Sequence, residues 1–133
     1  MLYPVYVHPG DATHSHGAEV PDFPGCFSAA DDLQDLPRKV QEAAEVWCDG
    51  EDMDLPEPTA LEELATNTDF TGGMWMLIDI DVSRLDVRSN QKPMRINISM
   101  PQGLVHQIDA AARASGATRS GFLAKAARQA MSA

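Results

Sequence analysis

Residues 92–131 read KPMRINISMPQGLVHQIDAAARASGATRSGFLAKAARQAM, and this stretch decides the interpretation of the whole chain. Apolar and polar side chains alternate from Arg95 to Met100, which predicts a strand with two different faces. Two segments with apolar residues every three or four positions follow, and they predict two helices separated at residues 115–117. A lone strand and two short helices cannot bury their own apolar side, so we expect a second copy of the chain to complete the core.

The two faces of the predicted strand indicate two different tasks. Ile96 and Ile98 share one face and belong in the core of a dimer. Arg95, Asn97 and Ser99 share the other face. Their guanidinium, amide and hydroxyl groups suit hydrogen bonding to base edges in the DNA major groove, which admits a two-stranded ribbon.

The predicted helices contribute a phosphate site and the rest of the dimer core. The first spans 102–114 and ends at Gly116. The N-terminus of the second offers free N–H groups to a phosphate, beside a cation and two hydroxyl groups. We predict DNA contacts at seven residues: Lys92, Arg95, Asn97, Ser99, Thr118, Arg119 and Ser120. The predicted dimer core has six: Ile96, Ile98, Leu104, Ile108, Phe122 and Leu123.

The order of these features resembles a ribbon-helix-helix DNA-binding domain. The match rests on the alternating strand, Pro101, Gly116, the Arg119–Ser120 pair and the apolar helix positions around them. The resemblance implies a homodimer, or a tetramer, that binds operator DNA. The alternative interpretation is an ordinary strand and helical hairpin packed on the N-terminal part of the chain.

Charge divides the chain near the same place. Residues 1–90 hold 19 acidic and 4 basic side chains, whereas residues 91–133 hold 1 acidic and 6 basic side chains. We expect the basic end to meet phosphates and the acidic end to meet a basic protein. The alternative is that the acidic residues only keep the protein soluble. The predicted domains are 1–88 and 89–133.

The N-terminal part predicts a small α+β fold with an antiparallel sheet and one long helix. Apolar runs at 2–8, 18–20 and 74–82 predict three strands. Apolar residues recur at helical spacing over 33–47, which predicts a helix of about four turns.

This order of strands and helix is similar to the HicB antitoxin family. The resemblance places Pro21-Asp22-Phe23-Pro24-Gly25-Cys26 on the second strand, ahead of a long helix rich in Glu and Ala, here Gln41-Glu42-Ala43-Ala44-Glu45. The family usually has Gly-Asp-Thr before the helix, where this chain has Ala30-Asp31-Asp32, and Pro37 replaces a helix former. The resemblance implies an N-terminal domain like a truncated ribonuclease H fold.

The resemblance also implies two functions. The N-terminal domain would bind and neutralise a HicA-type toxin, a small basic mRNA interferase, by covering its catalytic histidine. The C-terminal dimer would bind the operator of its own operon and repress it. The toxin face would comprise Asp31, Asp32, Asp35, Glu42 and Trp47, with core packing as the alternative role for Trp47. The alternative function is a ribbon-helix-helix regulator whose N-terminal domain senses a ligand or fixes the oligomeric state.

The sequence does not favour an enzyme. Asp22, Asp79 and Asp81 could form the magnesium site of a nuclease, but alternating Asp residues more often form a solvated strand face. Three histidines near Asp11 could bind a metal, although a flexible polar turn is the better interpretation. We therefore predict no catalytic residue, no metal and no cofactor.

The remaining features bear on the compartment. No segment approaches the roughly 20 apolar residues of a membrane span, and no basic start with an apolar core predicts a secretory signal. Cys26 and Cys48 lack a metal-binding spacing and are interpreted as buried thiols in a reducing compartment, with a disulfide between them left open. We expect a cytoplasmic protein without membrane contact.

Overall fold

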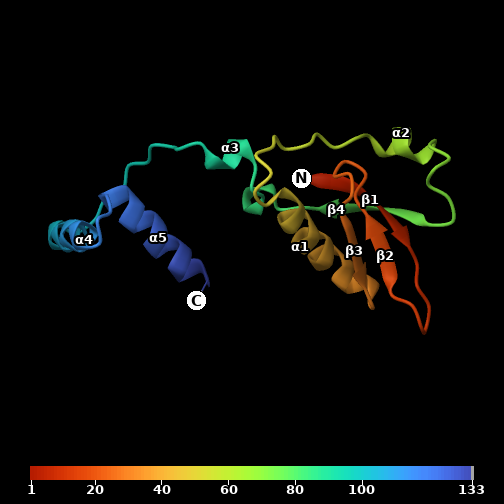
Figure 1. Ribbon diagram of the computed structural model, residues 1–133, viewed down its shortest axis with the longest axis horizontal. Helices are drawn as coiled ribbons and strands as arrows, with labels where there is room; N and C mark the ends of the chain where they lie inside the picture. Colours follow the sequence, from red (N-terminus) through yellow and green to blue (C-terminus); the bar gives the residue numbers. More distant parts are fainter. Residues whose placement is uncertain (133) are drawn as a thin grey trace. The chain divides into compact units, whose positions relative to one another are not determined.

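The computed structural model describes residues 1–132 and divides the chain into two units. Met1–Pro93, the N-terminal unit, holds the sheet, and Met94–Ala133, the C-terminal unit, holds two helices (Figure 1). The division falls a few residues after the expected boundary between 88 and 89.

Four antiparallel strands form the sheet in the order β3-β2-β1-β4. Their bounds are Leu2–His8 for β1, His16–Glu19 for β2, Phe27–Ala30 for β3 and Met74–Asp79 for β4. Strand β3 was not predicted from the sequence. The prediction that residues 21–26 lie on the second strand is wrong. Residues 21–25 form the turn from β2 to β3, and Gly25 adopts a positive φ of 86° that favours glycine.

Pro4 lies in a central strand without disturbing the sheet. Residues of an antiparallel strand bond alternately to the neighbours on either side. The N–H of Ile80 donates to the carbonyl of Met1 at 2.9 Å, which fixes the alternation. The backbone groups of odd-numbered residues therefore bond to β4, and the backbone nitrogen of Pro4 points toward β2. There the ladder ends at the pair of Tyr6 with Glu19, so no pair of the ladder needs an N–H from Pro4.

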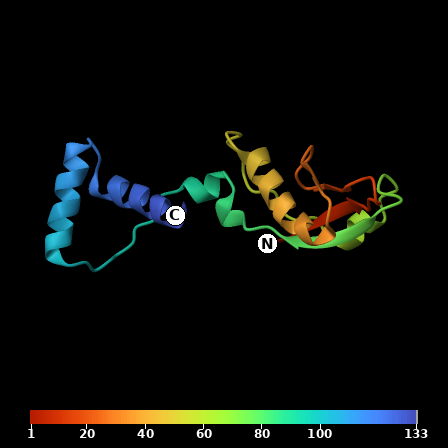
Figure 2. The same cartoon turned by 90° about the horizontal axis from the view of Figure 1, so that it is seen from below.

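Helix α1 covers one face of the sheet, as the two views in Figures 1 and 2 show. A 3-10 turn, η1 (Leu33–Asp35), leads into α1 (Leu36–Cys48). Pro37 lies in the first turn of α1, where its missing N–H needs no partner. The buried α1 residues recur every four positions and pack with the inward side chains of β1 and β4: Leu36, Val40, Ala44 and Cys48.

Both cysteines are buried free thiols, as expected. Cys26 and Cys48 belong to the core beneath α1. Burial raises the pKa of Cys26 to about 11, so this thiol stays protonated and unreactive at neutral pH.

The opposite face of the sheet carries an aromatic cluster. The rings of Tyr6, Phe70 and Trp75 lie 4.9–5.1 Å apart. The Tyr6 hydroxyl accepts a hydrogen bond from the N–H of Gly73 at 2.6 Å and so secures the loop before β4. Between α1 and this loop, along the chain, lies the short helix α2 (Leu61–Ala65).

Residues 89–91, predicted to belong to the C-terminal domain, are bonded to the N-terminal unit. They belong to α3 (Arg88–Gln91), which follows the 3-10 turn η2 (Val82–Arg84). The Asn90 amide donates to the carbonyls of Val82 and Leu85 at 2.7 and 2.9 Å. Arg88 binds the Asp52 carboxylate at 3.1 Å, and its own N–H donates to the Met53 carbonyl at 3.0 Å. The connection to the C-terminal unit therefore begins after Gln91.

The C-terminal unit contains α4 (Gln102–Ala114) and α5 (Arg119–Ser132), close to the predicted positions. Gly116 ends α4 with a φ of 72°. The N–H of Ala117 donates to Ala112 and that of Gly116 to Arg113, a pattern that satisfies the last free carbonyls of the helix. Thr118 caps α5 by accepting from the N–H of Gly121 at 3.0 Å.

The predicted strand over Arg95–Met100 is not formed in the single chain. Residues 93–101 have no regular secondary structure, and Ile96 and Ile98 are 71% and 57% exposed. A strand needs the backbone of a neighbour, and no other segment of residues 1–132 pairs with this one. The expectation of a strand therefore depends on a second chain.

Candidate functional site

The three aspartates expected on the toxin face lie between β3 and α1, and all are exposed. Two of them also hold the local backbone. Asp31 accepts from the Ser15 hydroxyl at 2.6 Å, and Asp32 caps η1 by accepting from the N–H of Gln34 at 2.9 Å. Asp35 makes no side-chain capping bond at the start of α1. The segment presents three carboxylates to solvent on an ordered backbone.

Glu42 lies on the exposed side of α1 with two basic neighbours. Its carboxylate lies 3.1 Å from Arg38 and 3.9 Å from Lys39. Pairs of this kind on a solvated helix face contribute little to stability. Glu42 can therefore give up these ion pairs at little cost and pair with a basic group of a partner instead.

Trp47 packs against the turn that joins β2 to β3. Its indole stacks on Phe23 with ring centroids 4.8 Å apart and planes 5° apart. The indole N–H donates to the Pro24 carbonyl at 2.9 Å. These contacts support the alternative, structural role for Trp47, because they fasten the 21–25 turn to α1.

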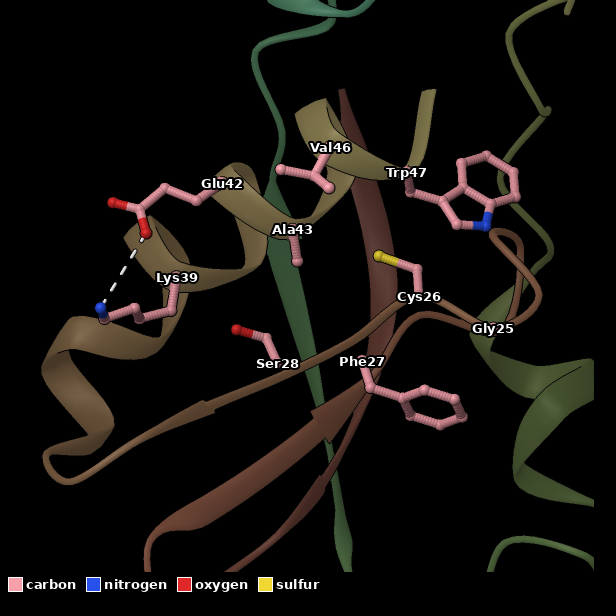
Figure 3. Close-up of a pocket in the computed structure, with 9 residues that line it drawn as sticks. All are labelled: Gly25, Cys26, Phe27, Ser28, Lys39, Glu42, Ala43, Val46 and Trp47. Atoms are coloured by element: carbon pink, nitrogen blue, oxygen red, sulfur yellow. Dashed lines mark ion pairs between the residues drawn. The ribbon is translucent and has the colours of Figure 1, made fainter. Parts of the chain in front are cut away.

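An open groove runs between α1 and β3, with a volume of about 420 Å³ (Figure 3). We call it the α1–β3 groove. Its lining residues are Gly25, Cys26, Phe27, Ser28, Lys39, Glu42, Ala43, Val46 and Trp47.

Sequence reasoning found only Glu42 and Trp47 among these residues. Val46 was missed, although it is 77% exposed on a helix whose other outward positions are mostly polar. An apolar residue outside the buried stripe of an amphipathic helix was the signal available for it. The groove was missed because β3 was.

The residues predicted to contact DNA fall into two groups. Four lie in the exposed segment before α4: Lys92, Arg95, Asn97 and Ser99. Of the other three, Ser120 is exposed and Thr118 is the α5 cap. Arg119 makes two bonds to Asp109, 2.9 Å from Nε and 2.8 Å from Nη2. These hydrogen bonds lower the pKa of Asp109 and raise that of Arg119.

The six predicted dimer-core positions differ in exposure. Ile108 of α4 is buried, whereas Leu104 is 43% exposed and Ile96 and Ile98 are more exposed still. Phe122 and Leu123 are half-buried. The helix pair thus covers only part of its apolar surface by itself.

The carboxylates considered for a metal site have local partners. Asp22 accepts from the backbone N–H and the hydroxyl of Thr59. Asp79 lies 2.6 Å from the amino group of Met1. Asp81 accepts from the Ser83 hydroxyl, which lowers its pKa. In the part of the chain that the structure describes, no group of three or more His, Cys, Asp or Glu side chains is placed to hold a metal ion.

Comparison with known families decides the assignment. A family model described as HicB_like antitoxin of bacterial toxin-antitoxin system matches residues 3–127. The chain belongs to the HicB-like antitoxin family. The predicted HicB resemblance is confirmed, and so is an α+β fold with an antiparallel sheet.

Solved HicB structures share the fold. The chain is 37% identical to the Burkholderia pseudomallei antitoxin HicB, with a TM-score of 0.55 and 98% of each chain covered. A chain of a HicA3 and HicB3 toxin-antitoxin complex matches with a TM-score of 0.53 at 24% identity, covering 61% of this chain and 99% of that one.

A curated phage protein is also similar. It is an uncharacterised 14.9 kDa protein in the rep-hol intergenic region of Haemophilus phage HP1 (strain HP1c1). The two sequences are 30% identical over 112 residues, which cover 82% of this chain and 80% of the phage protein.

None of the helices within residues 1–132 has the length and apolar character needed to cross a membrane.

Proposed function

We propose that this HicB-family chain binds and neutralises a HicA-type toxin and, as a dimer or higher oligomer, binds operator DNA to repress its own operon. The observation that carries the proposal is the family match, which extends through both units, over residues 3–127. Each unit has a surface suited to one of the two partners.

The N-terminal unit suits a basic toxin. It holds 19 acidic side chains against 5 Lys and Arg. Glu42 lines the α1–β3 groove, and Asp31, Asp32 and Asp35 carry exposed carboxylates in the segment that joins β3 to α1. Opposite charge speeds the encounter of two proteins, and an apolar hollow can accept an anchoring side chain. A chain of a solved HicA3 and HicB3 toxin-antitoxin complex has a similar fold.

The C-terminal unit suits an operator. On the ribbon-helix-helix interpretation, residues 95–100 of two chains pair as a ribbon, which covers Ile96 and Ile98 and turns Arg95, Asn97 and Ser99 toward base edges. The start of α5 offers N–H groups and the Ser120 hydroxyl to a phosphate. Because Arg119 uses Nε and Nη2 for Asp109, its Nη1 is the nitrogen that would reach a phosphate.

The proposal carries further expectations. The N-terminal unit is a truncated ribonuclease H-like binding domain without a catalytic role of its own. The protein acts in the cytoplasm without membrane contact. Residues 1–88 bind the toxin and residues 89–133 form the ribbon-helix-helix domain.

Co-expression tests the toxin half, and operator binding tests the DNA half. The experiment first searches the adjacent reading frames for a short, basic HicA-type protein. That protein is then induced in cells with and without this chain, and growth is followed. We expect the chain to restore growth and to retard operator DNA in a gel. Persistent growth arrest would contradict the antitoxin role, and operator binding without neutralisation would favour a plain ribbon-helix-helix regulator.

A further inference from the structure

We propose that the basic toxin docks by adding an extended segment to the free edge of β3, with alternate side chains of that segment entering the α1–β3 groove. The inference rests on the proposed function and specifies how its toxin-binding surface works. Strand addition of this kind draws affinity from backbone hydrogen bonds and specificity from side-chain pockets.

The backbone of β3 has a free hydrogen-bonding side. β3 is the outer strand of the order β3-β2-β1-β4. The N–H of Val20 donates to the Cys26 carbonyl at 3.2 Å, and Ala18 pairs with Ser28 in the same ladder. Bonding alternates along an antiparallel strand, so the N–H and C=O groups of Phe27 and Ala29 point away from the sheet.

The free edge carries none of the usual devices that prevent strand addition. Edge strands are commonly guarded by lysine, proline, inward charges or bulges. Residues 27–30 read Phe-Ser-Ala-Ala, without charge or proline. Three of the four side chains are small, so a second backbone can approach closely.

The groove lies on the side of this edge that faces α1. In Figure 3 the side chains of Cys26 and Ser28 point toward α1, and that of Phe27 points away from it. A strand added beside Phe27 and Ala29 would follow the same alternation, so every second side chain would lie between β3 and α1. There it would meet the apolar surface of Ala43 and Val46.

Charge identifies the occupant as a basic segment. Asp31 and Asp32 follow directly after β3. Across the groove lie Glu42 and one cation, Lys39, which is 3.9 Å from the Glu42 carboxylate, so the carboxylates outnumber it. A second copy of the N-terminal unit would carry the same excess of acidic side chains, 19 against 5 Lys and Arg, and like charges disfavour that pairing. A strand that carries Lys or Arg beside one apolar anchor fits both the edge and the groove.

Hydrogen exchange tests the docking mode. The full chain is compared free and in complex with the HicA-type toxin found by the co-expression test, with the toxin's catalytic histidine replaced so that cells survive. We expect the Phe27 and Ala29 amides to exchange fast in the free chain and to become protected in the complex. The Ser28 and Ala30 amides should be protected in both, because they bond to β2.

Two matched variants test the groove and the edge. Val46→Arg should weaken toxin binding about tenfold or more, whereas Leu77→Arg, at a similarly exposed apolar site on β4, should leave it unchanged. Ala29→Pro removes one outward N–H at a position that tolerates proline in an edge strand, and it should weaken binding while the circular dichroism spectrum stays unchanged.

The outcomes separate this inference from the proposed function. If the toxin binds the wild type while Phe27 and Ala29 stay unprotected, or if Val46→Arg and Ala29→Pro bind normally, strand addition is wrong and the antitoxin role stands. If the wild type does not bind the toxin at all, both are wrong.

Discussion

The N-terminal unit buries its apolar residues within one chain, whereas the C-terminal unit leaves most of its own exposed. Tyr3, Val40 and Ile80 have no exposed surface. In the C-terminal unit, only Ile108 and Ala112 are buried among the residues described. Surface removed from water supplies most of the driving force for folding. The first unit can therefore be stable alone. For the second unit we expect a partner, and with it a stability that rises with the chain concentration.

Replacing Ile96 by Asp is the strongest way to break this comparison. A charge at the centre of the expected dimer core should abolish dimerisation and, with it, operator binding. Sedimentation velocity and a gel-shift assay measure the two effects. Leu77→Asp, at an exposed apolar site of the N-terminal unit, is the control and should change neither. A variant that still sedimented as a dimer would show that the exposed apolar side chains of Ile96 and Ile98 do not form the dimer interface.

Replacing Leu36 by Ala tests the other side of the comparison. Leu36 is completely buried on the inner side of α1, and truncating such a side chain costs about 2–5 kcal/mol in the free energy of unfolding. Urea denaturation measures this loss, with the exposed Val46→Ala as control. Dimerisation through the C-terminal unit should persist, and its loss would mean that the two units do not fold independently.

Arg95→Ala should separate the two activities. Losing a side chain that reads a base edge should weaken operator binding by roughly 1–3 kcal/mol and relax base preference. Toxin binding should not change, because Arg95 lies outside the N-terminal unit. Arg38→Ala, on α1, is the matched arginine control and should leave operator affinity unchanged. Two titrations, one with toxin and one with operator, decide the matter; a parallel fall in both affinities would argue against separate surfaces.

The smallest effect is expected for Asp109→Asn. The pKa of Asp109 is lowered by Arg119, so its contribution to stability is present above the ordinary aspartate pKa of about 3.9 and is lost as the pH falls through the lowered value. The variant should therefore melt slightly below the wild type at pH 7, and the difference should shrink in acid. Asp69→Asn, an exposed loop change, should show no such pH dependence, and an equal gap at both pH values would exclude the ion pair as the cause.

Periodicity predicted the helices better than it predicted the strands. α4 matches the range expected from its apolar spacing, and α1 begins only after a 3-10 turn that the same spacing could not distinguish from helix. β3 was missed because Phe-Ser-Ala-Ala is short and lacks the alternating branched side chains that mark a strand. The groove depends on β3 and was missed with it.

Other parts of the candidate site depend on contacts that a linear pattern does not contain. Arg119 and Asp109 are ten positions apart and meet only because the turn at Gly116 folds α5 back toward α4. Residues 95–100 have a strand pattern, but no segment within residues 1–132 pairs with them, and the second chain that we propose as their partner leaves no trace in the linear pattern.

The stacked indole of Trp47 has a practical consequence for spectroscopy. Both tryptophans of the chain belong to the N-terminal unit: Trp47 at the groove and Trp75 in the aromatic cluster of the other sheet face. Intrinsic fluorescence excited at the red edge of indole absorption therefore reports on that unit alone. A ligand that contacts Trp47 would alter the tryptophan emission directly. An event confined to the two C-terminal helices, which contain no tryptophan, would leave the emission unchanged, so one unlabelled sample can distinguish the two.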